Sequence, residues 1–586
     1  MRTQSAPLFL KLWPSFGDLA FLAPIALLFG HMNGARTLLS DCDTGWHIRT
    51  GEWIMAHHAV PVRDIFSYSK PGDPWYAWEW LSDVVFAWLN GHGGLRGVVL
   101  FSVLLLSLTF TLLFRLVRGK SNLIVAILIT VLAAVASSVH WLARPHLFTL
   151  LFLVLFYTAL EHVKEGKERL AGVPYLAILP VATVLWTNLH GGFVTGILMI
   201  AAYGAGEVLE LVFAENSGKT HRQECLCHGT AHRQECLCHW AKAGRYFGSA
   251  LACLAASLIN PYFYRLHTHI WAYLGDPFNS QYIQEFLSPN FHNLEVRFFE
   301  MMLVLAVAAA GWSLSKGRFT EPLLLGMWAH AALLAGRNIE IFALAAAVPV
   351  AGTIQEWLER LPEWNVAEWL QKAGRRFNRL AASAGRTEAA AGGWRVVSAM
   401  SLALVGALLY APNPPKRFRA EFDPKRYPTG VLETLRRDPS ARIFTDDEWG
   451  DYLIWSLYPS HKVFVDGRSD FYGHDFEERY IDVLNVKYNW EKILGRFGVD
   501  TILLPISAPL AGALKESSRW RLVFDDGVAL VFRSRGKNDP HEDVLQKDGG
   551  TSSSVAQTGT GRGRDREVTK TEARDQAITR DQKIKT

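Results

Sequence analysis

The feature that most constrains this chain is a series of apolar runs, each about 20 residues long, the length that crosses the hydrocarbon core of a bilayer as a helix. They recur as far as about Pro412, and the remainder is more polar. We predict eleven spans, at residues 17–37, 95–117, 122–141, 145–162, 173–190, 192–213, 245–260, 297–316, 321–336, 338–356 and 394–411. The chain is therefore expected to be a polytopic α-helical membrane protein with about eleven transmembrane helices. This excludes a soluble globular enzyme, a fibrous protein and a largely disordered chain.

The distribution of Lys and Arg indicates the orientation. These residues precede the first predicted span and gather after the second, fourth, sixth, eighth and tenth. Because positively charged loops remain cytoplasmic, residues 1–16 are predicted to lie in the cytoplasm and the loops at 38–94 and 261–296 outside. The first span has no small-residue cleavage site, so we interpret it as a retained anchor of the bundle at 17–411.

The more polar C-terminal part is expected to form an extracytoplasmic α/β domain over residues 412–537. Strands are predicted at 441–445, 461–466 and 499–505, with helices at 475–497 and 508–517 between or after them. A hairpin should follow, with Asp526-Gly527 at its turn. Residues 538–586 are rich in Ser, Thr, Gly, Gln and charges, and we expect this tail to be disordered.

The first outer loop carries the most informative motif, Asp41-Cys42-Asp43, directly after the first span. Two carboxylates one residue apart can bind a divalent cation such as Mg²⁺ or Mn²⁺, and one of them with a raised pKa can act as a general base. The alternative is an interfacial aromatic belt with solvated acids. In the same loop we expect three further residues to contact substrate: His47, Arg49 and Glu79.

Polar side chains also stand at the predicted outer ends of other spans, where charges are costly unless they are paired or functional. Arg144, His190 and Arg337 are the candidates, and the two arginines suit a lipid phosphate. Snorkelling residues and turn formers at helix ends are the alternative. The loop at 261–296, which contains His269 and Glu285, is expected to be either a lid or an interfacial helix.

A near-identical segment, HRQECLCH, occurs at 221–228 and again at 232–239. Its Cys and His side chains are types that ligate zinc, but their spacing differs from that of common zinc modules. We interpret the repeat as a duplication in a cytoplasmic loop that tolerates insertion.

From Asp41, Asp43 and the helix that follows them, the chain resembles the GT-C class of integral-membrane glycosyltransferases. It is also similar in layout to the catalytic subunit of oligosaccharyltransferase, whose outer domain carries a Trp-Trp-Asp-Tyr-Gly motif. The corresponding place here reads Asp447-Glu448-Trp449-Gly450-Asp451-Tyr452, in a different order, and Val465-Asp466-Gly467-Arg468 follows. The resemblance, together with these acid, Arg and aromatic residues, gives further candidates for substrate contact: Trp449, Asp451, Tyr452 and Arg468. A turn at the end of a strand is their alternative explanation.

The resemblance, which extends to bacterial membrane proteins described as glycosyltransferase-like, implies a multi-pass enzyme of the bacterial cytoplasmic membrane. It would move a sugar from a polyprenyl-phosphate donor in the bilayer to an extracytoplasmic glycan, lipid or protein, with Asp41 and Asp43 as the catalytic acids. A transporter or flippase of lipid-linked glycans and a non-catalytic assembly protein are the alternatives. The net charge of +5 is small, so no nucleic-acid partner is expected.

Overall fold

The computed structural model describes residues 14–216, 231–391 and 396–535. All of these except Arg535 belong to a compact unit, Met1–Ser534. The predicted disordered tail lies outside the described residues, and the side chains of the duplicated segment at 221–239 do too.

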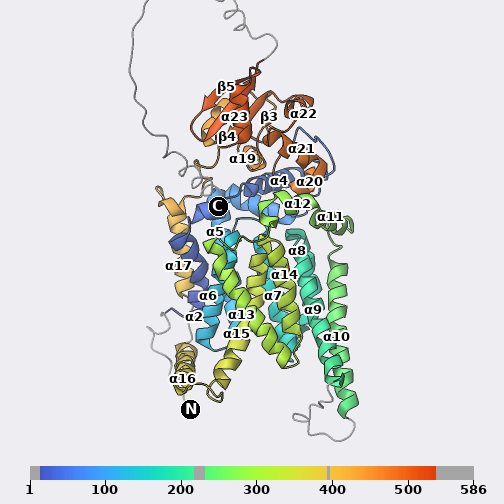
Figure 1. Cartoon of the computed structure of the whole chain (residues 1–586), viewed down its shortest axis with the longest axis vertical. Coiled ribbons are helices and arrows are strands. Elements are labelled where there is room, and N and C mark those ends of the chain that lie inside the picture. The colour runs from blue at the N-terminus through green and yellow to red at the C-terminus, as the bar shows by residue number, and fades with distance from the viewer. Residues whose placement is uncertain (1–13, 217–230, 392–395, 536–586) are drawn as a thin grey trace, which may run out of the picture. The chain divides into compact units, whose positions relative to one another are not determined.

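Long apolar helices lie side by side and make up the larger part of the structure (Figure 1). Within the described ranges, six helices are long and apolar enough to cross a membrane: Trp80–Arg118, Leu123–His140, His146–Lys164, Phe193–Phe213, Leu294–Ser315 and Gly336–Arg360. Three shorter apolar helices are Phe16–His31, Tyr175–Leu189 and Val396–Leu409. A mainly helical membrane protein with a C-terminal sheet is confirmed. The count of eleven spans is not, because several predicted segments form helices that are too short or too polar.

The bundle elements have these bounds: α2 (Phe16–Ile25), α5 (Trp80–Arg118), α6 (Leu123–Ser137), α7 (His146–Lys164), α8 (Tyr175–Leu189), α9 (Phe193–Asn216), α10 (Ala231–Ala256), α13 (Arg297–Ser315), α14 (Thr320–Leu334), α15 (Ile339–Arg360) and α17 (Val396–Leu409). A tight turn (Arg169–Leu170, β1, with Val173–Pro174, β2) joins α7 to α8. The first and last of these helices are paired, since the Ser398 backbone N–H donates to the Asp18 carboxylate at 3.1 Å.

The loop at 38–94, which we call the first outer loop after its predicted side, is itself helical. It contains α3 (Ala35–Leu38), α4 (Asp43–His57) and the first part of α5, which bends at Gly94, where φ is +62°. Helix α4 packs closely on its neighbours because it carries glycines at the contacts. A Cβ on Gly51 would lie 2.0 Å from the Asp83 carbonyl oxygen of α5. A Cβ on Gly45 would lie 2.6 Å from the Trp455 Cβ. The sequence thus brings α4 against both α5 and the C-terminal part.

The loop at 261–296, which we call the second outer loop after its predicted side, contains α11 (Arg265–Leu274), α12 (Pro277–Tyr282) and a single turn, η3 (Gln284–Phe286). Asp276 caps α12 by accepting from the Phe278 backbone N–H at 2.9 Å. His269 of α11 contacts Asp470 at 2.9 Å and stacks on Tyr76 of the first outer loop. The loop therefore lies against both other outer segments, and η3 is held beside the ends of α6 and α14.

The C-terminal part contains a four-stranded sheet of order β3-β4-β6-β5. Strand β3 (Ile443–Phe444) runs parallel to β4 (Thr501–Pro505), and β6 (Ala529–Ser534) is antiparallel to β4 and to β5 (Trp520–Asp525). The predicted strands at 441–445 and 499–505 and the hairpin turn at Asp526-Gly527 are confirmed. The helices are α18 (Leu432–Arg436), α19 (Asp447–Leu457), α20 (Ser469–Tyr472), α21 (His474–Leu484), α22 (Trp490–Arg496) and α23 (Pro509–Glu516).

Two expectations for this part were wrong. Residues 461–466 are not a strand of the sheet. Instead Val463 pairs with the first outer loop, donating its N–H to the Phe66 carbonyl at 3.0 Å and accepting from the Tyr68 N–H at 2.9 Å. An apolar alternating segment looks the same in sequence whichever partner it pairs with. The predicted helix at 475–497 is two helices, α21 and α22, which are separated by residues with positive φ, Val486 and Asn489.

The orientation predicted from Lys and Arg can be tested by labelling. In a variant whose six cysteines are replaced by serine, Ser518→Cys in the C-terminal part and Lys316→Cys after α13 each introduce one exposed thiol. We expect a membrane-impermeant maleimide to label position 518 in intact spheroplasts and position 316 only after permeabilisation. The reverse pattern would overturn the orientation.

Candidate functional site

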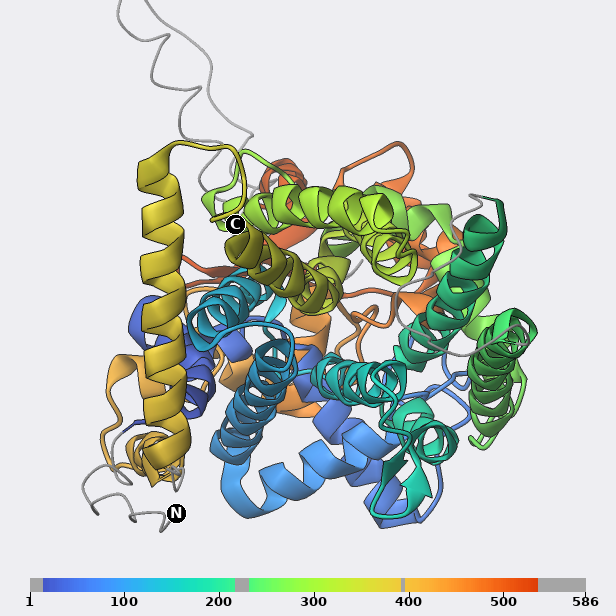
Figure 2. The same cartoon turned by 90° about the horizontal axis from the view of Figure 1, so that it is seen from below.

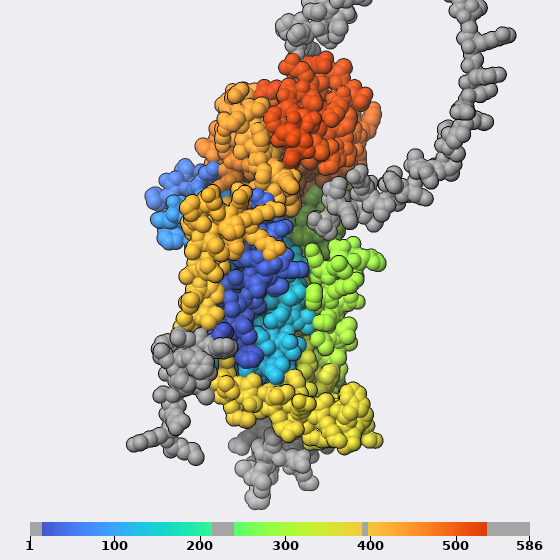
Figure 3. Space-filling model, turned by 90° about the vertical axis from the view of Figure 1, so that its left-hand side faces the viewer, coloured from blue at the N-terminus to red at the C-terminus, as the bar shows by residue number. Residues whose placement is uncertain are grey.

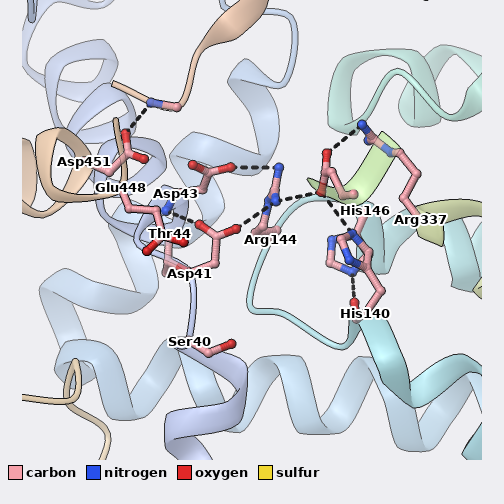
Figure 4. Close-up of polar contacts among 12 residues, drawn as sticks. Ser40, Asp41, Asp43, Thr44, His140, Arg144, His146, Arg337, Glu448 and Asp451 are labelled. Atoms are coloured by element: carbon pink, nitrogen blue, oxygen red, sulfur yellow. Dashed lines mark hydrogen bonds and ion pairs between the residues drawn. The ribbon is translucent and has the colours of Figure 1, made fainter. Parts of the chain in front are cut away.

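The two predicted catalytic aspartates lie at the start of α4. The Asp43 backbone N–H donates to Asp41 Oδ1 at 2.8 Å, so Asp41 folds back over the first turn of the helix. A carboxylate in this position also interacts favourably with the positive end of the helix. The second oxygen of Asp41 and the carboxylate of Asp43 both face Arg144 (Figure 4).

Arg144 is the centre of the site. It stands in the short turn between α6 and α7, and its guanidinium lies 3.0 Å from Asp41, 2.7 Å from Asp43 and 3.3 Å from Glu285. Its side chain is only 19% exposed. A guanidinium in this environment is held by several carboxylates because its planar fork presents donors on two edges.

Glu285 of η3 connects the two arginines predicted to hold phosphate. One of its oxygens lies 2.8 Å from Arg337 and the other 3.3 Å from Arg144. Burial opposes ionisation of this carboxyl, but Arg337 and then Arg144 lower the pKa of Glu285 to about 2. Glu285 was predicted only as a member of the loop at 261–296, because its neighbours in the sequence do not distinguish it from Glu295 and Glu300.

Asp451 of α19 brings the C-terminal part into the same group. It is 2% exposed, accepts from the Gly467 backbone N–H at 2.9 Å, and donates a hydrogen bond to Asp43. Burial raises the pKa of Asp43 to about 7 although Arg144 opposes this rise, and burial next to Asp43 raises the pKa of Asp451 further. A Cβ on Gly467 would lie 2.5 Å from the Asp43 carboxylate and 2.7 Å from that of Asp451, so a larger residue there would displace these side chains.

We name these six residues the Arg144 cluster: Asp41, Asp43, Arg144, Glu285, Arg337 and Asp451. They come from five separate stretches of the chain, and sequence reasoning had selected all of them except Glu285. What the structure adds is that they form one connected network of ion pairs and hydrogen bonds at one end of the helices (Figures 1 and 4).

A second polar chain leads away from the cluster along the start of α5. His190 Nε2 lies 3.2 Å from Glu79, whose other oxygen lies 3.5 Å from His47, and His47 Nδ1 lies 2.6 Å from Asp83. The Gly192 N–H donates to His190 Nδ1 at 2.9 Å, which leaves the Nε2 proton to be donated to Glu79. Burial raises the pKa of Glu79 to about 8, and the charge that most strongly opposes this rise is Arg144. His47, Glu79 and His190 are thus brought together beside the cluster.

The other predicted contact residues lie elsewhere. Arg49 donates to the Trp455 carbonyl at 3.0 Å and pairs with Glu52, so it joins α4 to α19. Trp449 and Tyr452 are buried inside the C-terminal part, where Trp449 donates to the Arg426 carbonyl and Tyr452 stacks on Tyr427.

Arg468 is 2% exposed and lies between Asp466, at 2.7 Å, and Asp64 of the first outer loop, at 2.8 Å. Its guanidinium also lies 4.4 Å from the ring centroid of Trp75. These contacts connect two outer segments rather than line the Arg144 cluster.

Asp41 and Asp43 were also expected to hold Mg²⁺ or Mn²⁺. Both carboxylates face the Arg144 guanidinium. Among the described side chains, those of residues 14–213, 240–389 and 396–535, no three His, Cys, Asp or Glu side chains are grouped as ligands for a metal ion. Because Mg²⁺ requires near-octahedral oxygen ligands, this donor set does not fit such a cation as it stands. The positive charge beside the aspartates comes from Arg144.

No protein-family model and no curated protein matches this chain. Among solved structures it is similar to the archaeal oligosaccharyltransferase AglB from Archaeoglobus fulgidus in complex with an inhibitory peptide and a dolichol-phosphate. That similarity has a TM-score of 0.48 and 12% identity over 90% of this chain and 74% of that chain. Another structure of the Archaeoglobus fulgidus oligosaccharyltransferase, in complex with Zn and sulfate, has a TM-score of 0.45 and 13% identity. That similarity covers 89% of this chain and 73% of that chain.

ArnT from Cupriavidus metallidurans in the apo state gives a TM-score of 0.39 and 13% identity over 89% of this chain and 93% of that chain. An oligosaccharyltransferase, the kind of protein whose layout the sequence resembles, is therefore among the similar structures. At these identities and TM-scores no residue role passes from those proteins to this chain.

Removal of the Arg468 guanidinium should destabilise the junction between the first outer loop and the C-terminal part. In Arg468→Gln, Asp64 and Asp466 would be left buried as unpaired like charges, which costs about 3–5 kcal/mol. We expect a lower melting temperature in detergent and faster proteolysis of the C-terminal part. Arg521→Gln, which alters an exposed arginine of β5, is the matched control and should melt as the wild type does. Equal melting of both variants would contradict the structural role of Arg468.

Proposed function

We propose that this chain is a membrane glycosyltransferase that moves a sugar from a polyprenyl-phosphate-linked donor to an acceptor on the outer side of a bacterial cytoplasmic membrane. The observation that supports this is the Arg144 cluster. Two arginines and four carboxyl groups meet at one end of the membrane-spanning helices. A lipid-linked phosphate would lie at that level, with its chain among the helices and its sugar towards the C-terminal part.

The arginines are suited to the donor phosphate. Arg144 and Arg337 both pair with Glu285, which is carried on the second outer loop and not on a spanning helix. A phosphate can replace a carboxylate on a guanidinium with similar bidentate geometry. In this proposal the donor phosphate takes the place of Glu285 between the two arginines. Their positive charge then stabilises the polyprenyl phosphate as it leaves.

Asp43 is suited to act as the general base. Its carboxylate lies 2.7 Å from Arg144, and a phosphate on Arg144 would therefore be close to it. The acceptor O–H or N–H would attack the anomeric carbon of the sugar. The bond from that carbon to the phosphate oxygen breaks, polyprenyl phosphate leaves with the electron pair, and Asp43 takes the acceptor proton. Asp451 holds Asp43 in place, and Asp41 orients Arg144.

The acceptor would approach from the C-terminal part, because Asp451 and the Gly467 backbone form that side of the cluster. His47, Glu79 and His190 lie beside the cluster at the start of α5, where we expect them to contact the donor. A glycan, a lipid or a protein acceptor all fit this layout.

Asp43→Asn is expected to lower the rate of sugar transfer about 10²–10⁴-fold, the usual contribution of a positioned base. The assay uses purified protein in detergent with a panel of radiolabelled polyprenyl-phosphate sugars, with and without Mg²⁺ or Mn²⁺. Asp73→Asn is the matched control, since Asp73 is a half-exposed acid of the same loop outside the cluster. Transfer at the wild-type rate by Asp43→Asn would overturn the assignment of the base.

Arg144→Gln is expected to weaken donor binding at least about tenfold, because a charge-assisted contact to phosphate contributes roughly 1.5–3 kcal/mol. Binding of the labelled donor to purified protein measures this without any acceptor. Arg63→Gln, which alters an exposed arginine of the first outer loop outside the cluster, is the control and should bind normally. A donor that binds both variants equally would place its phosphate away from the cluster and would favour a transporter or an assembly protein.

A further inference from the structure

Helix α16 (Glu368–Ala391) lies across the end of the bundle that is remote from the Arg144 cluster. Seen from below, it runs nearly at right angles to the spanning helices (Figure 2). In the space-filling view it belongs to the yellow surface at the end of the molecule opposite the C-terminal part (Figure 3). It is fastened to the bundle at two points. Asn378 donates to the Leu358 carbonyl of α15 at 2.8 Å, and Glu388 accepts from the Phe16 N–H of α2 at 3.1 Å.

The outward face of α16 is strongly basic. It bears five exposed cations, Lys372, Arg375, Arg376, Arg379 and Arg386. Lys372 pairs with Glu368 at 2.8 Å, and the other acid of the helix, Glu388, is used by α2. In the part of the chain that the structure describes, none of the four arginines forms an ion pair with a carboxylate. An unpaired positive stripe of this kind attracts anions.

Apolar side chains lie along one edge of this stripe. At 3.6 residues per turn, Trp369 and Leu380 fall on the same side of the helix, next to Arg376. They are 68% and 57% exposed, although the opposite face of α16 buries its apolar residues against the bundle. Arg375, Asn378 and Arg379 line a shallow surface hollow of about 530 Å³ along the other edge of the stripe. Cations next to an exposed Trp and Leu are typical of a helix that lies in the headgroup region of a membrane.

We propose that this face of α16 binds the headgroups of anionic phospholipids in the leaflet at that end of the bundle. Arg375, Arg376 and Arg379 hold the phosphates. Trp369 and Leu380 insert towards the acyl chains. The proposal stands apart from the transferase activity. A lipid partner is favoured over a soluble anion because the helix lies across the ends of membrane-spanning segments and presents apolar side chains beside the charges.

Native mass spectrometry of the purified full-length protein tests this. Delipidated protein is titrated with phosphatidylglycerol and, separately, with phosphatidylcholine of the same acyl chains. We expect the wild type to prefer phosphatidylglycerol and to lose that preference between about 50 and 300 mM salt, as screening increases. In Arg375→Gln/Arg376→Gln/Arg379→Gln the affinity for phosphatidylglycerol should fall at least about tenfold, with no change for phosphatidylcholine, because each cation near a surface contributes roughly a five-fold factor.

Two further variants separate the site from net charge. Lys492→Gln/Lys515→Gln/Arg521→Gln removes the same charge from exposed positions of the C-terminal part and should keep the wild-type preference. Arg375→Lys/Arg376→Lys/Arg379→Lys keeps the charge and should keep most of the binding. The altered positions are exposed, so all three variants should melt as the wild type does. Equal phosphatidylglycerol binding by the α16 glutamine variant, or equal losses in both glutamine variants, overturns the proposal.

Discussion

The site depends on one buried positive charge, that of Arg144. A guanidinium that is largely withdrawn from water requires counter-charges within a few ångströms, since an uncompensated buried charge is far more costly than any packing gain. Three carboxylates from two loops supply them: Asp41 and Asp43 at the start of α4, and Glu285 in η3. The electrostatic requirement of a single side chain thus draws the two outer loops towards the turn between α6 and α7.

The close approach of the outer segments depends on residues without side chains. Gly45 and Gly51 let α4 lie directly on α19 and α5, and Gly467 lets the backbone reach the Asp43–Asp451 pair. Arg468 then fixes the C-terminal part to the first outer loop through Asp64 and Asp466. Two independent features therefore fix the contact between the first outer loop and the C-terminal part: the close approach that the glycines allow and the ion pairs of Arg468. This redundancy keeps the carboxyl groups of the cluster in register with Arg144 (Figure 4).

The sequence predicted well what depends on local composition. Apolar runs located the bundle, and the position of Arg144 and Arg337 at span ends placed both beside the loop that carries Asp41. Long-range partnership was not predictable. The segment at 461–466 has the pattern of a strand but pairs with Phe66 and Tyr68 of the first outer loop. Arg468 was predicted to contact substrate because its motif is polar. Its partners are instead Asp64, about 400 residues away in the sequence, and the buried Asp466 beside it. Glu285 gained its role only from the arginines that fold around it.

The pairing of α2 with α17 and of Asp43 with Asp451 has a consequence for biosynthesis. Helix α2 and Asp43 are synthesised long before their partners, which lie several hundred residues further along the chain. At ordinary translation rates roughly 20–80 s separate the two aspartates. During that interval α2 lies in the bilayer without α17, and the cluster lacks the Asp451 carboxyl group. A nascent or truncated chain that lacks Asp451 would therefore contain both arginines and the first acids but no finished site, so the site can mature only after the C-terminal part has been made.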